Sequence, residues 1–217
     1  MEFQTERGML SCAPSRLIVA GWTGRDTAAV DHHIAELAAL GVPAPSSVPL
    51  YYQCAPALLT QEPAIQVLGT GSSGEAEPFL LRQDGTIWIG LGSDHTDRDL
   101  ETYSVAHSKQ ICAKPVAGTL WPLEEVADRL DSLKLQSWIL ENGSWVLYQD
   151  GTLAAIRPLT ELMAGAGFGD GDAMLCGTLP AVGGVRPAAG FKMALTDPVA
   201  ARSIEWAYQT RVLDVVG

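Results

Sequence analysis

Two acidic residues of the sequence are spaced so that they could bind one metal ion together. Glu75 and Glu77 are separated by a single residue, and residues i and i+2 of a β-strand point to the same face of a sheet. Two neighbouring carboxylates repel each other unless a cation lies between them, and carboxylate oxygens suit hard divalent cations. Most Glu-x-Glu triplets lie on a solvated strand face, and taken alone this triplet fits that alternative better.

A third carboxylate, Asp94, follows the end of the neighbouring strand. The apolar runs on either side of Asp84-Gly85 predict a β-hairpin, because Asp-Gly is a strong turn signal between such runs. The hairpin folds the chain back, so we expect Asp94 to lie beside Glu75 and to complete one face of a cation site. The alternative for residues 92–99 is a polar loop rich in turn-forming aspartates, whose Arg-Asp pair is a surface salt bridge of little energetic value.

A histidine and a glutamate could act as a general base and its partner. His33 and Glu36 fall in a helix that is predicted for residues 26–40 by N-terminal capping residues, several alanines and a terminating Gly-Val-Pro. Positions i and i+3 share a helix face, so the carboxylate could orient the imidazole and stabilise its charge. Without further motifs, the better interpretation of His33 and the neighbouring His32 is that they lie at an exposed helix start.

The rest of the pattern predicts many strands and a few helices. A second hairpin turns at Asn142-Gly143, and a further turn is predicted at residues 149–151. An amphipathic helix is predicted over residues 122–133. Further predicted elements are a strand at 16–22, an extended crossing segment at 43–56, a helix starting at 158, and strands at 174–178 and 191–195. We therefore expect an α+β protein with a large, mostly antiparallel or mixed sheet system.

Composition excludes several classes of function. The chain has 217 residues, of which 47% are hydrophobic and 18% charged, with a formal net charge of −11. This charge argues against nucleic acid as a partner and against docking on an anionic membrane, since both need clustered Lys and Arg. The four cysteines have no metal-site spacing, so reduced thiols in a cytoplasmic protein are expected. Neither a transmembrane run nor a signal peptide is predicted.

The order of these motifs resembles that of the fumarylacetoacetate hydrolase family. In that family a Glu-x-Glu strand is followed by a run, roughly Gly-Tyr-Thr-x-x-Asn-Asp-x-Ser-Ala-Arg-Asp, that supplies a third metal carboxylate. The segment 93–99 resembles the end of that run, with Arg98-Asp99 as its closing pair. Ser93 replaces the usual Asn, and Asp97 the usual Ala. The resemblance implies that Mg²⁺ (or Mn²⁺ or Ca²⁺) is held by Glu75, Glu77 and Asp94.

Two further matches concern catalytic side chains. The family has an early His-x-x-Glu, which puts His33 and Glu36 in the positions of a catalytic dyad. Residues 114–123 resemble the family's stretch from a substrate-facing lysine to a Pro-Leu-Gly-Pro turn. Lys114 fits that lysine better than Lys109, although either could be a plain surface lysine. The resemblance therefore implies His33, Glu36 and Lys114 as catalytic residues.

A last match and several departures define how far the resemblance extends. Residues 171–180 resemble the family's Gly-Asp-x-Ile-x-x-Gly-Thr-Pro with one residue inserted, which makes Thr178 a candidate for substrate binding. The match covers about residues 17–213. The spacing between the Glu-x-Glu and the third carboxylate is shorter than usual, and an Asp after the lysine and a later Gly-Pro are missing. The chain thus resembles most a group of short, divergent bacterial members known only as a domain of unknown function.

The resemblance implies an architecture as well as a site. We expect a mixed β-roll or sandwich of the family's C-terminal type with a few helices, forming one domain over residues 1–217. Residues 1–60 would supply a lead-in strand, a lid helix and the crossing segment, and residues 61–217 the β-rich catalytic core. A homodimer is the usual assembly in the family.

The implied activity is metal-dependent hydrolysis of a carbon–carbon bond in an acylpyruvate-like acid, a 2-oxo or 1,3-dicarbonyl compound, through a metal-stabilised enolate. His33, oriented by Glu36, would activate water, and Lys114 would add positive charge. A decarboxylase, isomerase or hydratase on the same scaffold is the alternative, and a non-catalytic β-rich binding protein is a second one. The predicted substrate is a small carboxylate, and the candidates for binding it are Thr178, Arg98 and, from its position in the chain alone, Gln53.

Overall fold

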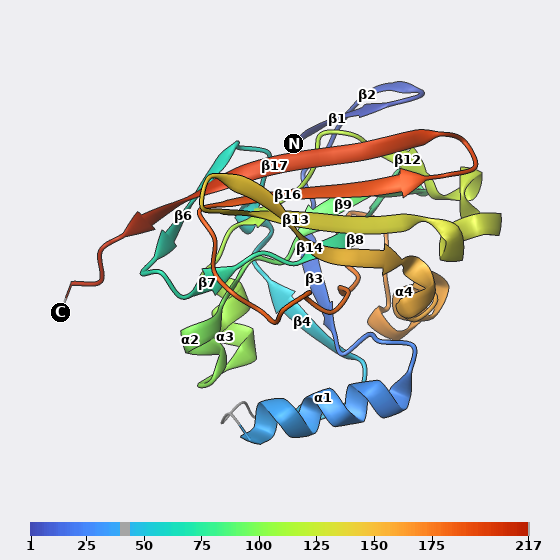
Figure 1. The fold of residues 1–217 in the computed structure, drawn as a ribbon. Helices are drawn as coiled ribbons and strands as arrows, with labels where there is room; N and C mark the ends of the chain where they lie inside the picture. Colours follow the sequence, from blue (N-terminus) through green and yellow to red (C-terminus); the bar gives the residue numbers. More distant parts are fainter. Residues whose placement is uncertain (40–43, 217) are drawn as a thin grey trace.

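The computed structural model describes residues 1–39 and 44–216, with the exception of the side chains of His33 and Leu37. Two large sheets account for most of the strands (Figure 1). One has six strands in the order β12-β9-β8-β15-β3-β4, and the other has five in the order β14-β13-β16-β17-β6. Strands outnumber helices, so the α+β, mostly β class expected from the sequence is confirmed.

The six-stranded sheet contains the hairpin predicted around Asp84-Gly85. Both turn residues have positive φ, 52° and 77°, which a two-residue turn matched to the strand twist requires. Strand β15 pairs antiparallel with β8 and parallel with β3, so the sheet is mixed. Its strands in spatial order are β12 (Trp121–Pro122), β9 (Thr86–Ser93), β8 (Ala76–Gln83), β15 (Asp172–Leu175), β3 (Arg16–Gly21) and β4 (Leu50–Cys54).

The five-stranded sheet contains the second predicted hairpin, at Asn142-Gly143, again with two positive φ angles. The turn predicted at residues 149–151 is wrong, because the strand continues and Asp150 and Gly151 pair with the neighbouring strand. A break in register after Ser137 absorbs the mismatch between the two strands. The strands in spatial order are β14 (Ser144–Thr152), β13 (Lys134–Glu141), β16 (Gly190–Asp197), β17 (Arg202–Leu213) and β6 (Ala64–Leu68).

Short pairs and helices complete the described chain. The amphipathic helix predicted over residues 122–133 is instead two 3₁₀ segments, η2 (Leu123–Glu125) and η3 (Ala127–Ser132), because the backbone leaves helical geometry at Arg129. The other short strands and helices are β1 (Glu2–Thr5), β2 (Gly8–Ser11), β5 (Leu59–Thr60), β7 (Ser72–Ser73), β10 (Thr96–Asp97), β11 (Lys114–Pro115), α1 (Thr27–Ala39), α2 (Arg98–Glu101), α3 (Val105–Gln110), α4 (Leu159–Ala166), η1 (Pro56–Leu58) and η4 (Leu153–Ala155). Among the described helices, none has the length and apolar character needed to cross a bilayer.

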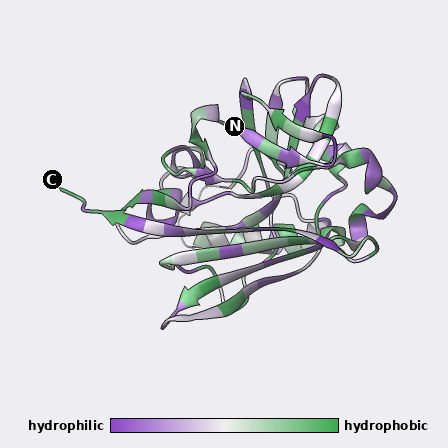
Figure 2. Ribbon diagram, turned by 90° about the horizontal axis from the view of Figure 1, so that it is seen from above, coloured by the Kyte–Doolittle hydropathy of each residue, from purple (hydrophilic) through white to green (hydrophobic). Residues whose placement is uncertain are grey.

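The six-stranded sheet is buried on both faces. Alternate residues of β8 belong to different clusters: Leu80 packs with the residues that face the five-stranded sheet, whereas Phe79 packs with the opposite layer, which includes Phe3 of β1. Such double burial explains why this sheet's strands read as nearly continuous apolar runs. In the five-stranded sheet, buried and exposed residues alternate instead, as they do along β17. Figure 2 shows polar and apolar residues interleaved along its strands.

One buried ion pair ties η3 to the end of β16. Asp197 is fully buried and accepts hydrogen bonds from the Arg129 guanidinium (2.9 Å from Nη2) and from the Val199 backbone N–H (3.1 Å). The hydrogen bond from Arg129 outweighs the opposing effect of burial and lowers the pKa of Asp197 from 3.8 to about 2.

The stability that Asp197 contributes is expected to disappear in acid. Because its pKa is lower in the folded protein than in the unfolded chain, the contribution is complete above the unfolded value of 3.8 and is lost as the pH falls toward about 2. Asp197→Asn should therefore lower the urea midpoint at pH 7, and the gap to the wild type should close as the pH is lowered through this window. A gap that is the same at pH 7 and pH 2 would contradict this assignment.

Candidate metal centre

The β8–β9 hairpin brings three acidic side chains together. Ala76 pairs with Ser93 across the hairpin, and one step beyond this pair the Asp94 N–H donates to the Glu75 carbonyl oxygen at 3.0 Å. One carboxylate oxygen each from Glu75, Glu77 and Asp94 lies within 4.8 Å of the others. Glu77 and Asp94 are 2% and 0% exposed, and Glu75 is partly buried. The three residues, named the acidic triad below, are thus on one face of the sheet.

Three positively charged side chains surround the acidic triad. Lys109 Nζ contacts Asp94 Oδ2, and Lys114 Nζ lies 3.0 Å from Asp94 Oδ1. Arg98 Nη2 lies 3.0 Å from Glu75 Oε1. Both lysines are buried, so the alternative of a plain surface lysine is wrong for each of them. Both lysines therefore reach the acidic triad, and the role of Lys114 toward a substrate stays a prediction.

In this buried site the pKa values of Glu77 and Asp94 shift in opposite directions. Burial, and then the charges of Asp94 and Glu75, raise the pKa of Glu77 well above its ordinary value. Burial also opposes ionisation of Asp94, but the two lysine ammonium groups outweigh it and hold the pKa of Asp94 well below its ordinary value. The Glu77 carboxylate has one fixed donor, the Gly177 backbone N–H at 2.8 Å from Oε2.

The donor set fits a hard divalent cation. The three ligand atoms are all carboxylate oxygens, which Mg²⁺, Mn²⁺ and Ca²⁺ prefer. Asp94 Oδ1 is buried and makes no hydrogen bond within the described part of the chain, since the Lys114 ammonium beside it lacks hydrogen-bond geometry. A buried acceptor without a hydrogen bond is costly, and a cation between the carboxylates would satisfy it and offset their mutual repulsion.

A buried hydrogen-bond network, which no sequence pattern indicated, fixes the backbone of the acidic triad. Ser93 Oγ accepts from the Glu75 N–H at 3.2 Å and lies 2.9 Å from the Tyr208 hydroxyl. His95 bridges Tyr208 (3.0 Å from Nδ1) and Ser72 Oγ (2.9 Å from Nε2). Burial, then the charges of Lys114 and Arg98, lower the pKa of His95 to about 3, so its ring is neutral.

The two departures from the family run have local explanations. Ser93, in place of Asn, supplies the hydroxyl that binds the Glu75 N–H. Asp97, in place of Ala, caps the short helix α2 by accepting from the Leu100 N–H at 2.9 Å. This cap orients Arg98, the first residue of the helix. Both substitutions therefore support the position of the acidic triad.

Two of the predicted substrate-binding residues lie beside the acidic triad. Thr178 follows Gly177; its hydroxyl donates to the Ala76 carbonyl at 2.7 Å and accepts from Gln149 Nε2 at 2.6 Å. Arg98 is held by Glu75, by Ser73 Oγ at 2.8 Å from Nε and by Glu101 at 3.0 Å from Nη1. Both side chains are thus fixed next to the carboxylates, and their roles toward a substrate stay predictions.

The predicted dyad and Gln53 are placed differently. The side chain of His33 lies outside the described residues. Glu36 is 58% exposed on α1 and lies 3.3 Å from His32 Nε2, an i,i+4 pair. Figure 1 shows α1 at the periphery, below β4. Gln53 is exposed on the edge strand β4, with β15 and β3 between it and β8. Within the described side chains, neither Glu36 nor Gln53 joins the group around the acidic triad.

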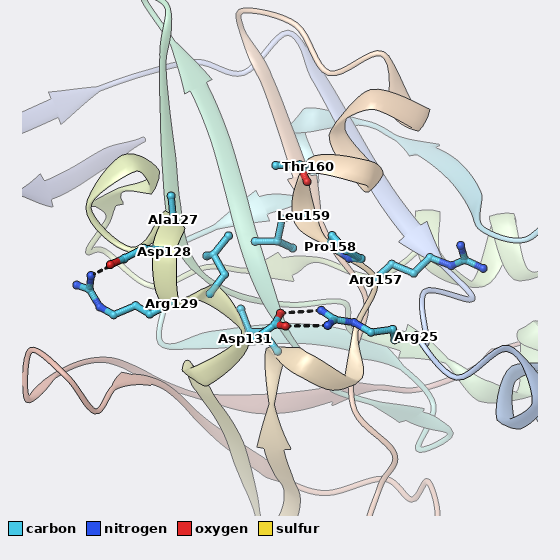
Figure 3. Close-up of a pocket in the computed structure, with 11 residues that line it drawn as sticks. Arg25, Ala127, Asp128, Arg129, Asp131, Arg157, Pro158, Leu159 and Thr160 are labelled. Atoms are coloured by element: carbon cyan, nitrogen blue, oxygen red, sulfur yellow. Dashed lines mark hydrogen bonds and ion pairs between the residues drawn. The ribbon is translucent and has the colours of Figure 1, made fainter.

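Two surface cavities lie elsewhere. A cavity of about 350 Å³ is lined by η3, η4 and the start of α4, where Arg25 makes a bidentate ion pair with Asp131 (2.7 and 2.8 Å; Figure 3). Arg25 directly precedes the segment that enters α1, so this pair anchors the base of that helix. A second cavity, of about 390 Å³, is lined by apolar residues such as Leu68 and Tyr103. The acidic triad lines neither cavity.

Comparison with known proteins gives the family and the fold. No curated protein matches the sequence. Among solved structures, a provisionally assigned fumarylpyruvate hydrolase from Burkholderia cenocepacia is 16% identical with a TM-score of 0.66, covering 98% of this chain and 95% of its own. A 2-keto-3-deoxy-D-arabinonate dehydratase complexed with magnesium and 2,5-dioxopentanoate is 13% identical with a TM-score of 0.64, covering 94% and 75%.

A third similar structure is the maleylpyruvate hydrolase of Sphingobium sp. SYK-6 in complex with manganese(II) and pyruvate, 15% identical with a TM-score of 0.59, covering 92% of this chain and 71% of its own. At these identities the three structures establish the fold alone. In the comparison with family models, residues 20–208 match the model of one family. The fold is thus of the fumarylacetoacetate hydrolase type expected from the sequence, and the chain belongs to the family described as Protein of unknown function (DUF2848).

Proposed function

We propose that this protein is a divalent-metal-dependent hydrolase that cleaves a carbon–carbon bond in an acylpyruvate-like 2-oxo acid. The observation that carries the proposal is the acidic triad, whose three carboxylates converge within 4.8 Å in a buried site beside Lys114. Similar structures include hydrolases of fumarylpyruvate and maleylpyruvate, the latter with manganese and pyruvate. Mg²⁺ or Mn²⁺ is accordingly the cation we propose.

The residues of the chain divide the chemistry among them. A cation held by the acidic triad would act as a Lewis acid toward the two oxygens of a 2-oxo acid. Lys114 is fully buried and fixed by the His95 carbonyl at 2.5 Å from Nζ, so its charge is preorganised to offset the negative charge that develops on those oxygens. Thr178 and Arg98 would bind the substrate's carboxylate beside them, and Gln53 would contribute only at the distal end of the substrate.

Hydrolysis also needs a base that activates water. His33, oriented by Glu36, is the candidate general base. Both residues lie on α1, which is peripheral and largely exposed in this structure, with Val30 as a buried contact. The proposal therefore requires α1 to close over the acidic triad when substrate binds, as a lid that turns about the Arg25–Asp131 anchor.

Replacing His33 should separate the activation of water from the binding of the cation. His33→Ala is expected to lower hydrolysis by roughly 10²–10⁴-fold, the usual contribution of a general base, and to leave cation affinity unchanged, because the acidic triad is untouched. Turnover and calorimetric cation titration measure the two effects, with His32→Ala as the matched control on the same helix. Unchanged turnover in His33→Ala would remove the dyad from the mechanism.

A lyase or isomerase reaction on the same scaffold is the second candidate. The observation that favours it is the peripheral position of α1, since a site without a water-activating base returns a proton to the substrate instead of hydrolysing it. One of the similar structures is a dehydratase. Product analysis by NMR after incubation of the metal-loaded protein with acylpyruvates and 2-oxo acids distinguishes cleavage from decarboxylation, isomerisation and hydration.

The first experiment is metal analysis of the purified protein, followed by assays before and after EDTA treatment. Stoichiometric cation and activity that is lost with EDTA and restored by Mg²⁺ or Mn²⁺ support the proposal. Absence of bound cation even after reloading would favour a non-catalytic binding protein. We propose a homodimer from the family resemblance and a cytoplasmic location from the four cysteines, which lack disulfide or metal-site spacing. Size-exclusion chromatography tests the dimer.

A further inference from the structure

Lys109 occupies an unusual position for a lysine. It lies on the short helix α3, is 6% exposed, and its ammonium contacts Asp94 Oδ2 in the acidic triad. An ammonium group therefore sits on a carboxylate that belongs to the candidate ligand set.

The two lysines on Asp94 are held differently. Lys114 Nζ also donates to the His95 carbonyl at 2.5 Å, and its backbone is fixed in β11, which pairs with β5. The Lys109 ammonium has a single hydrogen bond among the described residues, to Asp94; the charges of Glu75 and Glu77 also act on it, and the centroid of the Tyr52 ring is 5.7 Å away. An aromatic face attracts a cation more weakly than a carboxylate does, but it offers a favourable place beside the site. Lys109 can thus leave Asp94 at a smaller cost than Lys114.

The charges around the acidic triad set up a competition. The three carboxylates face three cationic side chains, Arg98, Lys109 and Lys114, so their formal charges balance before any metal binds. A divalent cation adds two positive charges next to the Lys109 ammonium. In a buried site of low effective dielectric such a repulsion is strong, so the Lys109 ammonium opposes the binding of a cation to the Asp94 carboxylate.

We propose that Lys109 is the internal counter-ion of the metal-free centre and that it leaves the Asp94 carboxylate when the cation binds, moving onto the face of Tyr52. The inference rests on the metal centre of the proposed function. Lys109 stabilises three crowded carboxylates while the metal is absent, and it lowers the affinity of the site for the metal. Lys114, held by its second partner, stays in place in both states.

The test is calorimetric titration of EDTA-treated protein with Mn²⁺. Lys109→Met is expected to bind Mn²⁺ at least about tenfold more tightly than the wild type, a difference of about 1.4 kcal/mol, because the competing charge is gone. Lys109→Gln, which keeps a polar side chain, is the second variant in case the first does not fold. Lys192→Met is the matched control, since Lys192 also pairs with a carboxylate (Glu205, 3.6 Å) and lies over a ring (Trp138, 5.3 Å), on the other sheet.

Thermal unfolding separates a counter-ion from a merely structural lysine. We expect Lys109→Met to unfold at a lower temperature than the wild type in EDTA and to regain most of the difference with saturating Mn²⁺. Equal losses with and without Mn²⁺, or an affinity unchanged or weakened in both Lys109 variants, would overturn the proposal. A wild type that binds no Mn²⁺ would overturn the metal centre itself, which is a distinguishable result.

Discussion

Glu75→Gln combined with Glu77→Gln is expected to weaken divalent cation binding by more than about 100-fold while the protein stays folded. Loss of a single outer-shell partner of a metal ligand typically costs 10–100-fold in affinity, and this change removes the charge of two ligands. The fold should survive because glutamine keeps the shape of the side chain and an oxygen that can accept from the Gly177 N–H, and because burial and acidic neighbours already oppose the charge of Glu77. Calorimetry with Mg²⁺ and Mn²⁺ measures the loss.

The control for this double variant is Glu124→Gln with Glu205→Gln. It removes the same charge from side chains that are 72% and 56% exposed and lie outside the acidic triad. Its cation affinity should equal that of the wild type, because exposed charges are screened. Stoichiometric Mg²⁺ in the Glu75→Gln and Glu77→Gln variant would refute the ligand assignment, whatever the effect on activity.

Asp94→Asn is expected to lower the free energy of unfolding by about 3–5 kcal/mol in EDTA, the usual result of removing one partner from a buried ion pair. The substitution leaves the ammonium groups of Lys109 and Lys114 buried without their carboxylate. Glu77→Gln should have the opposite sign: its raised pKa makes the folded protein pay for ionisation at neutral pH, and glutamine removes that cost. Urea unfolding of the two variants in EDTA measures both effects.

An exposed ion pair, between Asp128 and Arg129, provides the control for the stability loss expected in Asp94→Asn. Asp128 is 82% exposed and lies 2.9 Å from Arg129, so Asp128→Asn should change stability by less than about 0.5 kcal/mol. A similarly small effect of Asp94→Asn would mean that the two lysines find other partners when the carboxylate is lost. The assigned charge balance of the centre would then be wrong.

The part of the site that was predictable from sequence lies within one hairpin. The turn at Asp84-Gly85, together with the two-residue period of strands, places Glu75 and Glu77 on one face and returns the chain to Asp94. These relations lie within the 20 residues from Glu75 to Asp94 and are set by backbone geometry. The sequence pattern was less informative elsewhere: the helix expected at 122–133 is broken at Arg129, and the long strand β17 was not predicted.

What the sequence by itself determined is therefore the hairpin, the alternation of its side chains and the chemistry of three carboxylates. Only the tertiary structure decided which side chains surround them: Lys109 as well as Lys114 on Asp94, and Tyr208 of β17 on Ser93. The tyrosine and the serine are 115 residues apart in the chain. No local pattern encodes such a contact, because it arises from the packing of one sheet on the other. The register of a hairpin, in contrast, is set by the residues of its turn.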